Sequence, residues 1–140
     1  MFWDSSAVVP CLLPEARSRA ITSLLRADRE IVLWWASPIE CQSALYRRRR
    51  DDELSSALLD DGLRRLGALV EDADFIAPTT RVRDRAGRLL AAHPLRAADA
   101  LQLAAALVWC NETPQGEAFV CLDERLADAA RREGFAIRPA

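Results

Sequence analysis

The chain has 140 residues, 51% of them hydrophobic, with only 5 glycines and 7 prolines. These values exclude a disordered chain and favour one globular domain, residues 1–140, that buries its own core. The net charge of −2 gives no support to a general polyanion-binding protein, although it does not exclude a local basic patch.

The predicted elements alternate along the chain between short apolar segments and amphipathic segments, which favours an α/β fold with a parallel sheet. Strands are expected at residues 1–3, 30–36, 74–78, 117–123 and 135–139. Helices are expected at residues 6–13, 14–27, 37–50, 51–73, 79–93, 95–110 and 124–134. The apolar stripes of two helices are expected to face the core through Leu54, Leu58, Leu66 and Leu69, and through Val82, Ala86, Leu89 and Leu90.

No membrane or export segment is expected in this chain. No basic region precedes an apolar run at the N-terminus, and the longest mostly apolar run, residues 101–110, is too short to cross a membrane. We therefore expect a cytoplasmic protein.

The cysteine and histidine contents argue against two kinds of site. The four cysteines are separated widely, lie among apolar residues and form no CxxC pair, so we expect buried, reduced thiols. His93 is the single histidine, which argues against a zinc cluster and against histidine-based acid–base catalysis.

Two aspartates share one sequence context, the end of a strand followed by a helix. Asp4 follows the apolar residues "MFW", and Asp123 follows "FVCL". If the two strands are parallel neighbours, both side chains face the crevice at the carboxyl ends of the sheet, where α/β proteins bind ligands. Each has an ordinary alternative as a helix N-cap or a first-turn acid.

Two further acids are expected in the first turns of helices. Glu40 follows Ser37 and Pro38, so it also fits a capping box in which Ser37 is the N-cap. Asp99 lies among alanines and leucines in "LRAADALQLAAAL", where a role at the helix dipole is the alternative.

The four acids are expected to lie on the same side of a parallel sheet. Four carboxylates there would raise one another's pKa unless a cation held them. A site of carboxylate oxygens without histidine or cysteine suits Mg²⁺ or Mn²⁺.

Four segments together resemble the PIN-domain ribonucleases, specifically VapC-type toxins: "MFWDSSAVV", "SPIECQSAL", "LRAADALQLAAAL" and "FVCLDERLADAARREGF". The resemblance covers essentially the whole chain. It implies a PIN-like three-layer α/β/α fold with a mainly parallel sheet of about five strands. It also implies a metal-dependent endoribonuclease that cleaves RNA phosphodiester bonds.

The resemblance assigns the acidic quartet to Asp4, Glu40, Asp99 and Asp123, with Ser6 at a supporting hydroxyl position. With no lysine in the chain and a single histidine, we expect a bound Mg²⁺ or Mn²⁺ to activate the attacking water. Asp4, Asp99 and Asp123 would hold the ion or ions, and Glu40 would complete the ligand set or orient the water. Gln102 stands where many relatives carry histidine, and we attach no catalytic loss to that difference.

Several arginines are candidate RNA contacts. Arg81, Arg85 and Arg88 share one helix face, which is either an RNA-binding stripe or an ordinary solvated face. Arg96 is close in sequence to Asp99 and is a candidate phosphate contact. The run "RRRR" at residues 47–50 is less favoured, because it ends a helix and acids follow at 51–53.

The resemblance also implies protein partners: a VapB-type antitoxin and a second copy of the chain, giving a homodimer that assembles into a heterotetramer or larger complex with the antitoxin. An apolar groove for an antitoxin helix could involve Trp34, Trp35, Leu45 and Tyr46, although core packing is the favoured interpretation of the tryptophans.

Two alternatives to a toxin remain open: an RNA-processing PIN nuclease, and a PIN-like module that only binds RNA or protein. Receiver domains and haloacid-dehalogenase-type phosphatases are disfavoured, because both need a lysine. Nucleotide-binding proteins are disfavoured because neither GxxxxGK nor GxGxxG occurs.

Overall fold

A central sheet of parallel strands organises the fold. The structure is a computed structural model that describes residues 1–14 and 18–139. The strands are β1 Phe2–Trp3, β2 Val32–Trp34, β3 Asp74–Ile76, β4 Ala118–Val120 and β5 Ala136–Arg138. Their order is β3-β2-β1-β4-β5, and every neighbouring pair is parallel. The predicted α/β fold with a five-stranded parallel sheet is therefore confirmed, with β1 at the centre.

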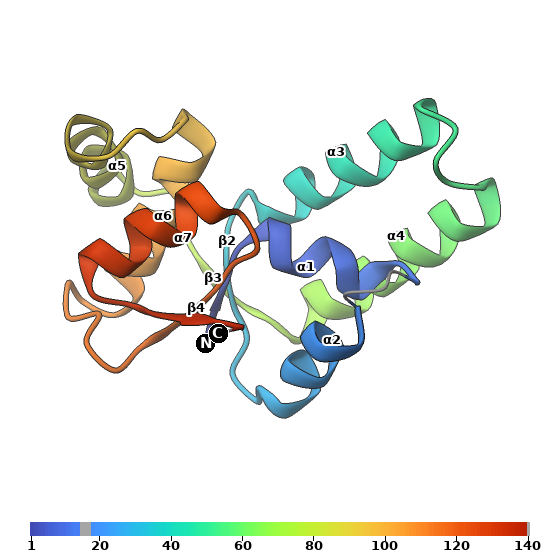
Figure 1. Cartoon of the computed structure of the whole chain (residues 1–140), viewed down its shortest axis with the longest axis horizontal. Helices are drawn as coiled ribbons and strands as arrows, with labels where there is room; N and C mark the ends of the chain where they lie inside the picture. Colours follow the sequence, from blue (N-terminus) through green and yellow to red (C-terminus); the bar gives the residue numbers. More distant parts are fainter. Residues whose placement is uncertain (15–17, 140) are drawn as a thin grey trace.

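Helices cover both faces of the sheet (Figure 1). One face carries α5 Thr80–Ala92, α6 Ala97–Trp109 and α7 Glu124–Glu133; the other carries α1 Ser5–Leu12, α2 Ser18–Ala27, α3 Ser37–Arg50 and α4 Ser56–Asp72. Successive strand residues point to opposite faces. Phe2 accordingly packs in the core under α6, whereas Trp3 packs in the core under α1. Both cores bury apolar side chains, which explains why the central strands β1, β2 and β4 are apolar throughout, whereas the edge strands β3 and β5 each carry one charged residue.

The helices α3 and α4 form a pair that extends away from the sheet (Figure 1). The chain reverses between them at Asp52, which has a positive φ of 57°, and α4 begins only at Ser56. The Ser55 hydroxyl caps α4 by accepting a hydrogen bond from the Leu58 amide. The predicted helix start at residue 51 is therefore wrong, because residues 51–55 make the turn.

Two leucines expected in the core are exposed. Leu58 is 37% exposed and Leu90 is 46% exposed, whereas Leu66 and Leu89 are buried. Leu90 lies about 100° around the helix from Leu89, and its side chain falls outside the face of α5 that packs on the core. The predicted start of the second helix at residues 14–17 falls partly outside the described residues, and α2 is seen from Ser18.

The cysteines are free thiols: Cys11, Cys41 and Cys121 are buried, and Cys110 is half-buried. The predicted burial is confirmed for Cys11, Cys41 and Cys121, whereas Cys110 is only half-buried. Among the described residues, no helix is both long enough and apolar enough to cross a membrane.

Candidate functional site

The carboxyl ends of the parallel strands lie along one edge of the sheet, and the chain places Asp4 there. Asp4 directly follows β1, and its backbone N–H donates a hydrogen bond of 2.9 Å to the Val120 carbonyl at the end of β4. Since β1 and β4 are parallel neighbours, Asp123, three residues beyond Val120, emerges beside Asp4.

A pocket of about 360 Å³ opens at this edge, and all four predicted acids line it: Asp4, Glu40, Asp99 and Asp123. The acids come from the end of β1, from α3, from α6 and from the start of α7. The remaining lining residues are Ser5, Ser6, Val9, Pro10, Ala44, Arg47 and Arg48. The fold thus brings together side chains that are up to 119 positions apart, from Asp4 to Asp123.

Asp4 is the most buried of the four acids, with 4% of its surface exposed. Burial raises the pKa of Asp4 to about 6; hydrogen bonds from Ser6 oppose the rise, and the nearby Glu40 charge adds to it. The Ser6 amide and the Cys121 thiol donate to Asp4 Oδ2, at 3.0 and 3.7 Å. Asp4 is therefore the N-cap of α1 as well as part of the pocket.

Ser6 and Asp123 connect the start of α1 to the start of α7. The Ser6 hydroxyl accepts hydrogen bonds from the Leu122 amide at 2.9 Å and the Asp123 amide at 3.2 Å. Asp123 Oδ1 accepts from the Leu126 amide at 2.9 Å, so Asp123 caps α7. The hydroxyl of Ser6 thereby holds the backbone of Asp123 close to Asp4.

Glu40 is held by side chains from two other helices. The Ser5 hydroxyl donates to Glu40 Oε2 at 2.8 Å, and Gln102 Nε2 donates to the same oxygen at 3.0 Å. The capping-box interpretation is wrong, because the N-cap of α3 is Ala36 instead of Ser37, and no side-chain hydrogen bond caps the helix there. Ser37 lies inside the helix, buried, where it contacts Gln102 instead.

Asp99 lies in the first turn of α6 and is half-buried. Its Oδ2 accepts a hydrogen bond of 3.3 Å from the Arg96 amide. The helix-start role considered for this residue is therefore present, and it coexists with a place in the pocket lining.

The donors in the pocket fit a hard divalent cation. They are carboxylate and hydroxyl oxygens, the ligand type of Mg²⁺ and Mn²⁺. The buried thiols are poor competitors, because burial, followed by the charge of Asp4, raises the pKa of Cys121. In residues 1–14 and 18–139, no three acids, cysteines or histidines are grouped closely enough to form a ready-made metal site. The fit therefore rests on donor chemistry and on the burial of Asp4.

The arginines predicted from sequence lie outside the pocket lining that the structure describes. Arg81, Arg88 and Arg96 are exposed, and Arg81 donates to Asn111 Oδ1 at 3.2 Å. Arg85 is half-buried and forms ion pairs, so the expectation that its side chain stands in solvent is wrong.

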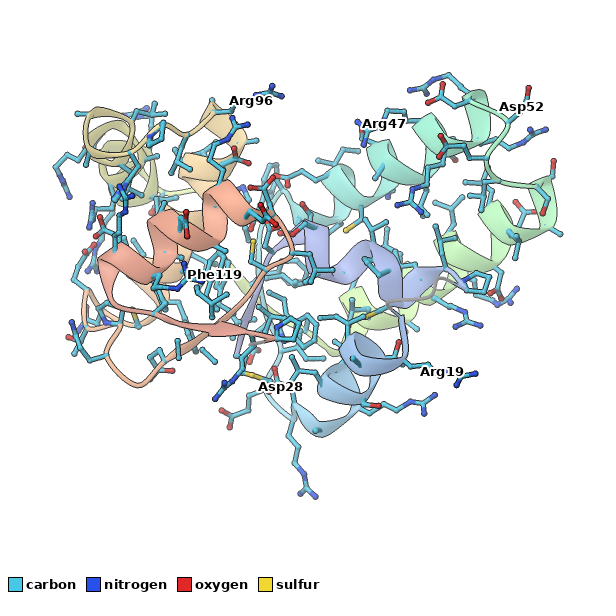
Figure 2. All side chains as sticks on the ribbon, viewed as in Figure 1. Arg19, Asp28, Arg47, Asp52, Arg96 and Phe119 are labelled. Carbon is cyan, nitrogen blue, oxygen red and sulfur yellow. The ribbon has the colours of Figure 1, made fainter. Side chains whose placement is uncertain are left out.

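Sequence reasoning underrated Arg47 and Arg48, which line the pocket. In Figure 2, Arg47 on α3 and Arg96 beside α6 lie on the same side of the molecule. Sequence reasoning also missed the contacts of Ser5 and Gln102 with Glu40. The signal for Gln102 is visible in hindsight: an amide inside an Ala/Leu-rich helix, three residues after Asp99.

Comparisons with known proteins identify the family and the fold of the chain. The model of the PIN domain family matches residues 1–132. The structure is similar to the sarcin–ricin loop cleaving toxin VapC20 of Mycobacterium tuberculosis, with 16% identity, a TM-score of 0.67, and 96% of this chain and 95% of that chain covered. It is also similar to FitAcB from Neisseria gonorrhoeae, with 14% identity, a TM-score of 0.66, and 97% and 94% covered.

A comparison with curated protein sequences found no match. The family model covers nearly the whole chain, and both solved structures share its fold from end to end. The chain belongs to the PIN domain family.

Proposed function

We propose that this protein is a metal-dependent endoribonuclease and the toxin of a VapBC-type toxin–antitoxin pair. The observation that carries the proposal is the convergence of Asp4, Glu40, Asp99 and Asp123 on one pocket at the carboxyl edge of the sheet. Membership of the PIN family supports the nuclease activity. The likeness to VapC20, described as a toxin, supports the toxin role through the shared fold.

The proposed roles are those that the family resemblance implies, and the shared pocket of the four acids supports them. Asp4, Asp99 and Asp123 would hold Mg²⁺ or Mn²⁺, and Glu40 would complete the ligand set or orient the attacking water. When bound, the ion would lower the pKa of a water and stabilise charge on phosphoryl oxygens. Ser6 supports the site by binding the amides of Leu122 and Asp123.

The RNA would be held by the basic side chains around the acidic pocket. Arg47 and Arg48 line it, and Arg96 follows on the same side of the molecule (Figure 2). Arginine contacts to phosphates would offset the repulsion between the carboxylates and the RNA backbone. Arg81 and Arg88 extend the basic surface further away, and Arg85 is removed from this proposal because acids already pair with it.

A protein partner is proposed to cover exposed apolar side chains at the start of α3 and along it. Trp35, in the turn before α3, is 60% exposed. On α3 itself, Ile39 and Tyr46 are exposed, and their spacing of seven residues places them on one helix face. Of the apolar residues considered from sequence, Trp34 and Leu45 are buried in the core instead. The antitoxin and a second copy of the chain are the two proposed partners.

The decisive experiment is cleavage of total cellular RNA by purified protein with Mg²⁺ or Mn²⁺, with chelator, and with Asp99→Asn. Cleavage that requires metal and falls at least about 10³-fold in the variant is expected, because the substitution removes a ligand charge. The matched control is Asp84→Asn, an exposed aspartate on α5, which should cleave normally. Discrete fragments would identify the target by their ends, and normal cleavage by Asp99→Asn would contradict the assignment.

A further inference from the structure

Gln102 is a buried amide, and within residues 1–14 and 18–139 its side-chain hydrogen bonds all lead to α3. Only 1% of its surface is exposed, and its neighbours on α6, such as Leu103 and Ala104, belong to the core. Its Nε2 donates to Glu40 Oε2 at 3.0 Å and to the Ser37 hydroxyl at 3.1 Å. The same hydroxyl lies 3.5 Å from Gln102 Oε1. Among the residues that the structure describes, the partners of this amide therefore lie on the first turn of α3.

Such an amide is costly where it lies. Burying an amide without partners is unfavourable, and a methionine or leucine side chain would fill a similar volume at no polar cost. Packing alone therefore gives no reason for glutamine at this position. The specific feature it adds is the pair of N–H donors aimed at Ser37 and Glu40.

Two donors converge on one oxygen of Glu40. The Ser5 hydroxyl reaches Oε2 from α1 at 2.8 Å, and Gln102 reaches it from α6. In the described part of the chain, the hydrogen bonds of this carboxylate all end on Oε2. Two fixed donors on one oxygen leave the side chain little freedom to rotate, while Glu40 still lines the pocket.

We propose that Gln102 is a positioning residue for Glu40: together with Ser5 it holds Oε2, so that Oε1 is presented to the pocket as a single-oxygen ligand or water acceptor. This inference rests on the proposed nuclease function and deepens it. Gln102 does not touch the reacting atoms. It acts by restricting the Glu40 carboxylate to one orientation before substrate and metal arrive, as hydrogen-bond partners of metal-binding side chains commonly do.

The test replaces the donor and keeps the shape. Gln102→Met removes both N–H groups, and Gln42→Met, a matched change on α3 outside the pocket lining, is the control. We expect Gln102→Met to lower kcat and Mn²⁺ affinity by roughly 10- to 100-fold, with KM changed by less than about 3-fold. Gln102→His restores an N–H donor and should recover part of the loss.

A double-mutant cycle separates positioning from general destabilisation. Gln102→Met is combined with Glu40→Gln, and Mn²⁺ affinity is measured without RNA. If Gln102 acts through Glu40, adding Gln102→Met to Glu40→Gln should change Mn²⁺ affinity by less than about 2-fold. An equal penalty in both backgrounds would overturn the inference. If Gln102→Met fails to fold, Ser5→Ala, which removes the other donor, should lower Mn²⁺ affinity in the same direction.

A crystal structure of Gln102→Met beside the wild type decides the inference even if the function is wrong. Absence of metal-dependent cleavage by the wild type would refute the proposed nuclease. The structural part of the inference, that Gln102 orients Glu40, would still stand if the Glu40 carboxylate leaves its place in the variant crystal. It would fall if Glu40 keeps the same orientation there.

Discussion

Two clusters in this molecule withdraw an acid from water, and they compensate for it in opposite ways. At the end of α7, Glu133 receives hydrogen bonds from Arg85 Nη2 at 2.8 Å and from His93 Nε2 at 2.7 Å. In the pocket, Asp4 meets an amide, a thiol and the field of a second carboxylate. Glu133 is paired with an arginine and a histidine, whereas the hydrogen-bond donors that Asp4 meets in the described residues carry no positive charge.

The pKa values of the two acids move in opposite directions for this reason. Burial would raise the pKa of Glu133, but the hydrogen bonds of His93 and Arg85 outweigh it and lower that pKa. Burial raises the pKa of Asp4 to about 6, and Glu40 adds to the rise. The charge of Glu133 is thus compensated by side chains of the fold, whereas under the proposed function Asp4 would be stabilised by a bound cation.

Asp4→Asn should give the largest change in stability and remove the difference between the two clusters. In chelator at pH 7, the unfolding free energy should rise by up to about 3 kcal/mol, because the pKa of Asp4 is about 6 in the fold and 3.8 ordinarily. The folded wild type binds the extra proton between those values, so its stability increases as the pH falls from about 6 towards 4. Urea unfolding from pH 4 to 7.5 measures this gain.

The gain in Asp4→Asn should therefore disappear near pH 4, and Mg²⁺ should stabilise the wild type more than the variant. Asparagine remains a good N-cap, so the start of α1 is preserved. Asp60→Asn, at an exposed position on α4, is the control and should leave stability nearly unchanged. A loss of stability at pH 7 in Asp4→Asn would show that Asp4 is compensated within the fold.

Glu133→Gln should have a smaller effect of the opposite sign. It removes a carboxylate that holds Arg85 and His93 together, and the unfolding free energy should fall by about 1–2 kcal/mol at pH 7. A lowered pKa contributes stability above the ordinary glutamate range, and that contribution is lost as the pH falls through the folded pKa. The same urea series should show the difference in unfolding free energy between Glu133→Gln and the wild type shrinking as the pH falls. The control is Glu71→Gln, at an exposed position on α4.

Much of the fold and of the pocket could be predicted because the signals are local. An acid that follows a buried parallel strand must emerge at the carboxyl edge of the sheet, which is where Asp4 and Asp123 are found. Asp99 was conspicuous as a charge in an Ala/Leu-rich helix. The catalytic roles of these acids remain predictions.

What could not be predicted depends on how helices pack against one another. The contact of Gln102 with Ser37 joins residues 65 positions apart, and the pattern of apolar residues within α3 or α6 does not predict it. The same holds for Arg85: the sequence pattern predicts a solvated helix face, but in the fold Glu112 and Glu133 form ion pairs with this side chain. Arg47 appeared to be a helix-end charge, and only the direction of α3 brings it to the pocket.

Arg47→Gln should produce the smallest effect and sharpen the contrast between an arginine that lines the pocket and one that is held in ion pairs. Arg47 is exposed and lines the pocket, whereas Arg85 is committed to ion pairs. In an Asp99→Asn background, which prevents cleavage, the Kd for RNA should rise roughly 3- to 10-fold. The slope of log Kd against log salt should fall by about 0.7, the value for one lost phosphate contact on a single strand. The control is Arg50→Gln, which is exposed on the same helix but outside the pocket lining and should change RNA affinity less. Equal losses of affinity in both variants would indicate diffuse attraction of RNA along α3 instead of a phosphate contact at the pocket.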